Sequence, residues 1–366
     1  MAEAVSQMLA GGLHERAGRW FFRSGIQEAN GGVARYYRID LRRNARISTE
    51  ITGYAVSTFV WLFQTTTDEE YLAAARRAAR FLVEDAWDRD LHIFPFEHGV
   101  NGDAPEALAY FFDSGIITRG LLALWRVSGE ERWLAAARAA GESMVADFTC
   151  EGVSNPVLQL PAKRALSYEP RWSRRPGCYQ LKSALAWHEL AVATGEARLR
   201  AAFDEALAGA LRTHDSFLPD CTPEKTMDRL HAYCYFLEGL LPAPEHAGAR
   251  EALRSGMARV ARHLADIAPG FVRSDVYAQL LRIRLWAESV GIPLAEDEAR
   301  AEAEALPAFE LVSNDPRIDG AFAFGRRGHE LLPFANPVST AFAAQACHMW
   351  HQRLAGRPLP SPCDLI

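Results

Sequence analysis

The sequence lacks the features that mark several classes of protein. Its six cysteines are scattered at positions 150, 178, 221, 234, 347 and 363, without a CxxC pair, which is typical of free thiols in a cytosolic protein. No apolar run approaches the roughly 18 residues of a membrane span. The first residues, Met1–Gln7, include an early acid and no basic or apolar leader, unlike a secretory signal. We therefore expect a cytoplasmic protein with no membrane partner.

An excess of charge of one sign is also lacking. The chain has 40 Lys and Arg against 46 Asp and Glu, a net charge of −6, so nothing indicates nucleic acid as a partner. No Ser/Gly/Pro-rich or charged linker divides the 366 residues, and we expect a single domain over residues 1–366. His214, Cys221, His231 and Cys234 match no metal-binding template. We predict no metal and no cofactor, and the oligomeric state stays open.

What the sequence does contain is one pattern repeated six times. A loop marked by glycine or proline leads into an apolar helix, a short break and an Ala/Arg/Glu-rich amphipathic helix, most clearly over residues 50–75 and 113–137. Such a repeat cannot bury its apolar face alone, so the copies must stack. Inner helices are predicted to begin near Glu50, Asp113, Tyr179, Leu230, Ser274 and Pro337, and outer helices to cover 68–85, 129–148, 195–213, 246–266 and 294–307.

The sixth outer helix is predicted at the start of the chain, over Glu3–Phe22. If it packs on the last inner helix, Val338–Arg353, the helices close into an all-α (α/α)6 barrel or toroid of six helical hairpins, with short β-strands only in the loops. The alternative, an open superhelix, leaves these two helices without partners. Long loops precede the inner helices, and such loops are usually functional. We expect the site at the rim where inner helices begin.

The segment DSGIITRGLLALWRVSGEERWL, residues 113–134, resembles one that is common in unsaturated glucuronyl hydrolases and their relatives in the six-hairpin glycosidase superfamily. The resemblance implies an (α/α)6 fold over most of the chain. It also implies carbohydrate chemistry near Asp113, the one site residue to which it extends.

Glu50 and Asp113 occupy corresponding positions at the starts of consecutive inner helices. Neighbouring helix axes lie about 8–10 Å apart, close to the roughly 6.5–9.5 Å between the two carboxyl groups of an inverting glycosidase. One carboxyl group would protonate the leaving oxygen while the other activates water. The alternative is that each merely caps its helix.

Tyr179 and His231, at the starts of other inner helices, complete the predicted catalytic set. His231 and Tyr235, one turn apart, form a pair suited to proton abstraction by a lyase or epimerase, although a lone inner-helix histidine is more often a core residue. Six arginines in loop 23–46 and five basic residues in loop 149–177 favour an anionic sugar; the alternative is a rim of intramolecular ion pairs. The predicted substrate-binding residues are Arg35, Tyr54, Arg171, Trp172, Lys182, Tyr235, Arg273, Asp275 and Asn336.

These observations predict a carbohydrate-active enzyme, first of all a glycoside hydrolase, that uses general acid/base chemistry on an anionic, uronate-type or otherwise acidic saccharide. A sugar lyase or epimerase and a non-catalytic glycan- or partner-binding toroid are the alternatives. Two other chemistries of helical toroids fit less well. The DxDD and DDxxD motifs of terpenoid cyclases are missing, and Cys347-His348 lies too far inside the last helix for the zinc site of a lanthionine cyclase.

Overall fold

The computed structural model describes residues 12–97, 107–150 and 152–366, and it is mainly helical. The described residues form two compact units. The Glu50 unit comprises residues 27–35 and 46–217, and the His231 unit comprises residues 12–26, 36–45 and 218–366. Within the described ranges, no helix combines the length and the apolarity that a membrane crossing requires. The expectation of one domain over residues 1–366 stays a prediction.

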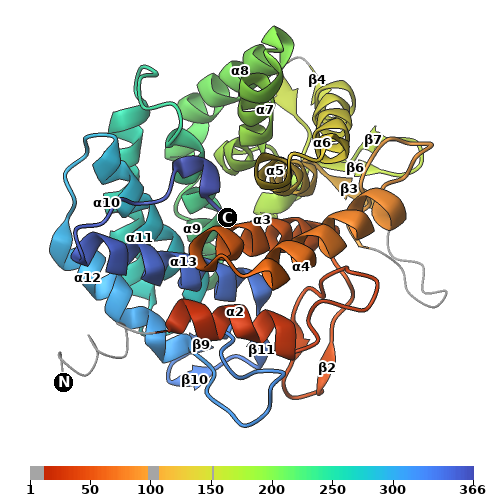
Figure 1. Cartoon of the computed structure of the whole chain (residues 1–366). Helices are drawn as coiled ribbons and strands as arrows, with labels where there is room; N and C mark the ends of the chain where they lie inside the picture. The colour runs from red at the N-terminus through yellow and green to blue at the C-terminus, as the bar shows by residue number, and fades with distance from the viewer. Residues whose placement is uncertain (1–11, 98–106, 151) are drawn as a thin grey trace. The chain divides into compact units, whose positions relative to one another are not determined.

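The Glu50 unit is built of hairpins of two neighbouring helices (Figure 1). In each hairpin an apolar inner helix is followed by a more polar outer helix. The pairs are α3 (Thr49–Thr66) with α4 (Glu69–Arg80), α5 (Phe111–Ser128) with α6 (Glu131–Ser143), and α7 (Leu181–Thr194) with α8 (Ala197–Thr213). Outer helices α4 and α6 continue into the π-helical turns η1 (Phe81–Ala86) and η2 (Met144–Phe148). Helix α3 packs on α5, and α5 packs on α7. The hairpins are therefore stacked in sequence order, as the repeat predicts.

The backbones of α3 and α5 touch where two glycines face each other. A methyl group on Gly120 would lie 2.6 Å from the carbonyl oxygen of Gly53, and one on Gly53 would lie 2.9 Å from the Cα atom of Ile117. Only glycine permits this approach, because backbone atoms cannot move aside as a flexible side chain can. The contact between backbones lies about one turn after Glu50 in α3 and one to two turns after Asp113 in α5, and it fixes the spacing of the two helices.

The His231 unit contains α9 (Pro223–Leu240) with α10 (Ala249–Ile267), α11 (Ser274–Ser289) with α12 (Glu296–Ala305), and α13 (Pro337–Leu354) with α2 (Leu13–Arg23). The last pair confirms the predicted packing of the N-terminal helix on the final helix. The N-terminal part of the predicted helix, residues 3–11, lies outside the described residues. Arg16 holds α2 in place through a two-bonded ion pair with Glu310, at 2.7 and 2.9 Å.

Helix α9 begins seven residues before the predicted start at Leu230, so that prediction was wrong. The Thr222 side chain accepts a hydrogen bond from the Lys225 amide, and Pro223 occupies the first helical position, a strong helix-start signal. The first turns of α9 are polar, which hid them from a search for apolar runs. His231 consequently lies about two turns inside α9 rather than at its start.

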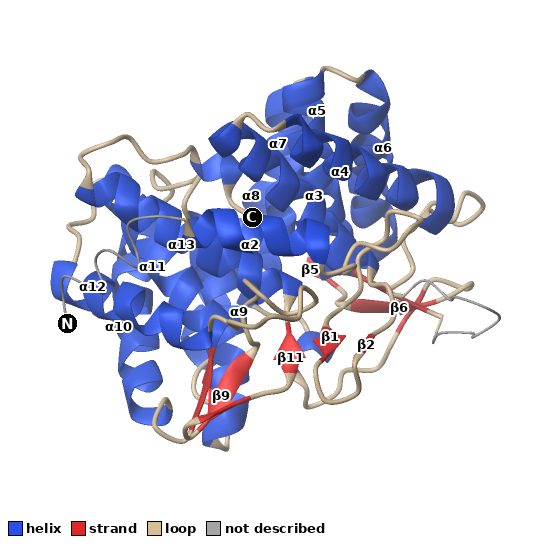
Figure 2. Cartoon of the chain, turned by 60° about the horizontal axis from the view of Figure 1, so that its bottom comes forward, coloured by secondary structure: helices blue, strands red, loops and turns tan. Residues whose placement is uncertain are grey.

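Strands are short and lie in the loops, as predicted (Figure 2). In the Glu50 unit, β3 (Leu108–Tyr110), β6 (Val157–Gln159) and β7 (Arg164–Ala165) form one antiparallel sheet, and β4 (Thr149–Cys150) pairs with β5 (Val153–Ser154). In the His231 unit, the sheets are β10 (Glu330–Leu331), β9 (Gly325–Arg327) and β8 (Phe271–Arg273), and β11 (Phe334–Ala335), β1 (Tyr37–Arg38) and β2 (Arg43–Asn44). Strand β3 runs directly into α5 and β8 into α11, so the sheets anchor the starts of these two inner helices.

Candidate functional site

Glu50 is the second residue of α3, and it does not cap the helix. Ser48 does so, accepting a hydrogen bond from the Ile51 amide at 3.4 Å. Part of the Glu50 side chain remains exposed. Burial nevertheless raises the pKa of its carboxyl group to about 7, although the positive charge of Arg35 opposes the shift. At neutral pH this carboxyl group is divided between its acidic and ionised forms.

Asp113 is the third residue of α5 and is only 4% exposed. Its pKa lies well above the ordinary value because the group is buried and because the negative charge of Glu50 disfavours ionisation. Among the described residues, no hydrogen-bond partner reaches its Oδ2 atom, and no side chain caps α5. Neither acid is the N-cap residue of its helix, because Ser48 holds that position in α3 and Tyr110 in α5. They are electrostatic neighbours with raised pKa values.

Arg35 is the cation beside this pair. Its guanidinium lies over the Phe96 ring, 5.3 Å from the centroid, and 3.7 Å from Glu97. Its charge lowers the pKa of both Glu50 and Asp113, and 43% of its side chain is exposed. Arg35 is thus both near the two carboxyl groups and open to a ligand.

The other predicted residues of the Glu50 unit differ in accessibility. Tyr179 lies in the 3-10 turn η4 (Cys178–Gln180), and its hydroxyl group donates a hydrogen bond to the Arg175 carbonyl oxygen at 3.2 Å. Burial raises the pKa of Tyr179. The Trp172 ring meets the Tyr179 ring edge-on at 5.0 Å. Tyr54 and Lys182 are buried, whereas Arg171 is exposed. Because the Tyr179 hydroxyl is committed and stays protonated, the carboxyl pair is better suited to proton transfer.

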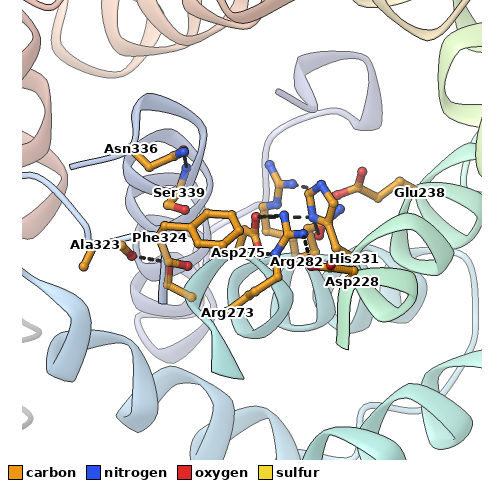
Figure 3. A network of polar contacts seen from close by, with 12 residues as sticks. Asp228, His231, Glu238, Arg273, Asp275, Arg282, Ala323, Phe324, Asn336 and Ser339 are labelled. Carbon is orange, nitrogen blue, oxygen red and sulfur yellow. Dashed lines mark hydrogen bonds and ion pairs between the residues drawn. The ribbon is translucent and has the colours of Figure 1, made fainter. Parts of the chain in front are cut away.

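Figure 3 shows the polar cluster of the His231 unit. His231 is 7% exposed, and its Nδ1 atom lies 2.8 Å from Oε1 of Gln279 and 3.4 Å from Oδ2 of Asp275. The Tyr235 ring lies 4.5 Å away between centroids. Burial and the charge of Arg273 lower the pKa of His231 to about 4, while Asp275, Gln279 and Glu238 act in the opposite direction. The imidazole is therefore neutral at pH 7.

Arg273 and Asp275 are bound to each other. The Nε and Nη2 atoms of Arg273 donate to the two oxygens of Asp275 at 3.0 and 2.6 Å, and Nη1 donates to Asp228 at 3.0 Å. The Arg273 guanidinium also covers the Phe324 ring at 4.5 Å. Burial alone would raise the pKa of Asp275, but the charges of Arg273 and His231 outweigh it and lower the pKa. The two residues thus form a fixed ion pair behind His231.

Asn336, the remaining predicted residue, accepts a hydrogen bond from the Ser339 amide at 2.9 Å and caps α13. Gln279 is the residue that sequence reasoning missed. It lies one turn after Asp275 on α11, and that spacing alone could have placed it beside a site. Within the described residues, no three His, Cys, Asp or Glu side chains are arranged to hold a metal ion.

Several basic residues of the two loops form ion pairs within the protein. Arg46 contacts Glu97 at 3.2 Å, and Lys163 contacts Asp147 at 2.7 Å. Arg38 contacts Asp40 in the same way, at 2.5 Å. For these residues the structure favours the alternative of an internally paired rim. Arg35 also contacts Glu97, at the longer distance of 3.7 Å, and it remains a candidate for contact with an anionic ligand because its charge acts on Glu50 and Asp113; Arg171 is a candidate because it is exposed.

Comparison with known proteins identifies the fold. No protein-family model matches the sequence, and no curated protein matches it either. Solved structures are similar over nearly their full length: a D-mannose isomerase (TM-score 0.73, 10% identity, 95% of this chain and 97% of that chain), a cellobiose 2-epimerase from Spirochaeta thermophila DSM 6192 (0.70, 16%, 97% and 98%), and the unsaturated glucuronyl hydrolase from Bacillus sp. GL1 (0.62, 14%, 93% and 96%). The chain has the fold of these proteins, the six-hairpin (α/α)6 toroid, as the sequence predicted.

Proposed function

We propose that the protein is a carbohydrate-active enzyme that hydrolyses a glycosidic bond of an acidic saccharide. The observation that carries the proposal is the pair formed by Glu50 and Asp113, two neighbouring carboxyl groups with raised pKa values at the starts of adjacent inner helices. Perturbed carboxyl groups of this kind mark acid/base sites. The shared fold with an isomerase, an epimerase and a hydrolase of sugars supports the substrate class.

The two acids divide the work according to their surroundings. Burial and the negative charge of Glu50 favour the protonated form of Asp113, so Asp113 would donate a proton to the oxygen of the leaving sugar. Glu50 titrates near pH 7, so its ionised fraction can accept a proton from the attacking water. Arg35, beside both, would pair with an acidic group of the saccharide. Arg171, exposed on its loop, would add a second positive charge.

A second reaction is favoured by a different observation. His231 is neutral at pH 7 and its Nδ1 atom faces two oxygens, so a lone pair on Nε2 could remove a proton from carbon. That step belongs to an epimerase or isomerase. Turnover in D2O separates the two reactions, because proton transfer at carbon places deuterium on a carbon of the product. Hydrolysis creates a new reducing end without such labelling.

The experiment that tests the main proposal is turnover of acidic di- and oligosaccharides by the wild type and by Asp113→Asn. The substitution keeps the shape of the side chain but removes the titratable group, so it should abolish hydrolysis with little loss of thermal stability. Asp147→Asn is the matched control: it breaks an ion pair with Lys163 outside the site and should remain active. Retained activity in Asp113→Asn, or its unfolding, would contradict the proposal. Binding by the wild type without turnover would instead support a glycan-binding toroid.

A further inference from the structure

We infer that Gln279 is a positioning residue for His231, because its side-chain oxygen holds the imidazole as the Nδ1–H tautomer and leaves Nε2 as the proton acceptor. The hydrolytic mechanism does not use this buried histidine. The tautomer of His231 depends only on the contacts of its ring. The catalytic role of that tautomer rests on the proposed second reaction, proton transfer at carbon.

The tautomer follows from the two oxygens that face one ring nitrogen. Oε1 of Gln279 lies 2.8 Å from Nδ1 of His231, and Oδ2 of Asp275 lies 3.4 Å from the same atom. Arg273 holds both oxygens of Asp275 and keeps it ionised, so the Asp275 carboxylate only accepts hydrogen bonds. A nitrogen between two acceptors must carry the proton, and Gln279 must then present its oxygen rather than its amide nitrogen.

Among the residues that the structure describes, no other polar contact explains Gln279. Its side chain is fully buried on α11, and among the described residues its Nε2 atom has no hydrogen-bond partner. A buried donor without a partner is unfavourable, whereas an apolar side chain of similar length would avoid that cost. Packing therefore does not account for a glutamine at this position. The hydrogen bond to His231 does.

Burial and the charge of Arg273 keep the imidazole uncharged, and the neutral amide of Gln279 opposes them less than a carboxylate would. The charged groups that face His231 are Arg273 at the end of β8, Asp275 on α11 and Glu238 on α9. A carboxylate in place of the Gln279 amide would add a negative charge at hydrogen-bond distance and stabilise the imidazolium. A glutamine orients the ring without that effect, and the imidazole stays unprotonated at neutral pH.

The test is a measurement of the His231 tautomer in the full-length protein labelled with 15N-histidine. Long-range 1H–15N spectra distinguish the protonated from the unprotonated ring nitrogen, and the signals of His231 are identified by their loss in His231→Phe. For the wild type we expect a protonated Nδ1 and an unprotonated Nε2 across pH 5–8. An Nε2–H tautomer in the wild type would overturn the inference.

Two substitutions complete the test. Gln279→Glu should retain the Nδ1–H tautomer and raise the pKa of His231 by about one unit or more, at least a tenfold change in its acid dissociation constant. Gln279→Met removes the acceptor at 2.8 Å and leaves only Asp275, at 3.4 Å, so part of the population should shift to the Nε2–H tautomer. Gln345→Met is the control for removal of a buried glutamine. Gln345 lies on α13 and bonds Arg282 rather than His231, so the tautomer of His231 should not change.

An unchanged pKa in Gln279→Glu, or an unchanged tautomer in Gln279→Met, would contradict the inference. If Gln279→Glu does not fold, the wild-type and Gln279→Met spectra decide. The result of turnover in D2O does not depend on the tautomer that these spectra measure. A missing deuterium label would therefore reject the second reaction while leaving the role of Gln279 intact.

Discussion

Replacing Glu50 with glutamine should stabilise the protein above neutral pH. Burial raises the pKa of Glu50 to about 7, against an ordinary value of 4.5. A carboxyl group whose pKa is higher in the folded than in the unfolded state binds its proton more tightly when folded. The free energy of unfolding therefore falls as the pH rises from the unfolded pKa through the folded one, and it stays low above pH 7. Glutamine keeps the shape of the side chain and carries no charge at any pH.

The size of the effect follows from the two pKa values. Each unit between them corresponds to about 1.4 kcal/mol, so the ionised Glu50 costs about 3 kcal/mol. The difference between Glu50→Gln and the wild type should be near zero at pH 4 and about 3 kcal/mol at pH 8. That is a large share of the roughly 5–15 kcal/mol by which a typical protein is stable. The substitution should at the same time abolish activity.

Glu189 on α7 supplies a control for which the glutamine substitution should lower, rather than raise, the free energy of unfolding. It is 5% exposed, and Arg119 and Arg126 each contact it at 2.7 Å. Burial alone would raise the pKa of Glu189, but the two arginines outweigh it and lower the pKa. Glu189→Gln leaves Arg119 buried without its charged partner, so the variant should lose roughly 2–5 kcal/mol at neutral pH.

Urea unfolding followed by far-UV circular dichroism between pH 4 and 9 measures all three proteins. Linear extrapolation gives the free energy of unfolding in water, and equal m-values show that the unfolding reaction is the same. The reasoning is refuted if Glu50→Gln is no more stable than the wild type at pH 8. It is also refuted if the stability difference is equal at pH 4 and pH 8, because Glu50 would then not titrate with a raised pKa.

Two further substitutions test the support of the site. Gly120→Ala should destabilise the protein by about 1–3 kcal/mol, because its methyl group meets backbone. Gly209→Ala on α8 is the control, because a methyl group there would meet only the tip of the Arg212 side chain, 3.7 Å away. It should be neutral or stabilise the protein by up to about 1 kcal/mol. If urea unfolding gives equal stabilities for the two variants, the α3–α5 contact is loose. Arg35→Gln should raise KM for an acidic saccharide, most strongly at low salt. It should also shift the acidic side of the pH–activity profile to higher pH, because the charge of Arg35 lowers the pKa of Glu50. An unchanged KM at low salt would remove Arg35 from the binding site.

The sequence was sufficient for the fold because the repeat carries its own signals. Helices α11 and α13 begin at the predicted residues, Ser274 and Pro337. The start of α9 was missed because its first turns are polar and apolar periodicity begins only at Leu230. A search for Thr-Pro at a helix start would have found it at Thr222.

The candidate site was less predictable. The matched positions of Glu50 and Asp113 could be read from the repeat, but their burial and mutual influence could not. The pairing of Arg273 with Asp275 and Asp228 depends on side-chain conformations at the junction of β8 and α11. Gln279 carries no charge and sits in no motif, so only its distance to His231 reveals it.

The contact between Gly53 and Gly120 has a consequence for engineering. Since backbone atoms set the spacing of α3 and α5, the side chains at positions 50 and 113 do not set it. Both positions can then be varied together while the distance between their Cα atoms is kept. A library randomised at these two positions would sample different pairs of functional groups in one geometry. Helices α5 and α7 approach each other in the same way, since a methyl group on Gly115 would lie 2.5 Å from the carbonyl oxygen of Ser183. Glu189 adds an ion pair with Arg119 across that contact, so variation at position 189 would remove a link between the two helices.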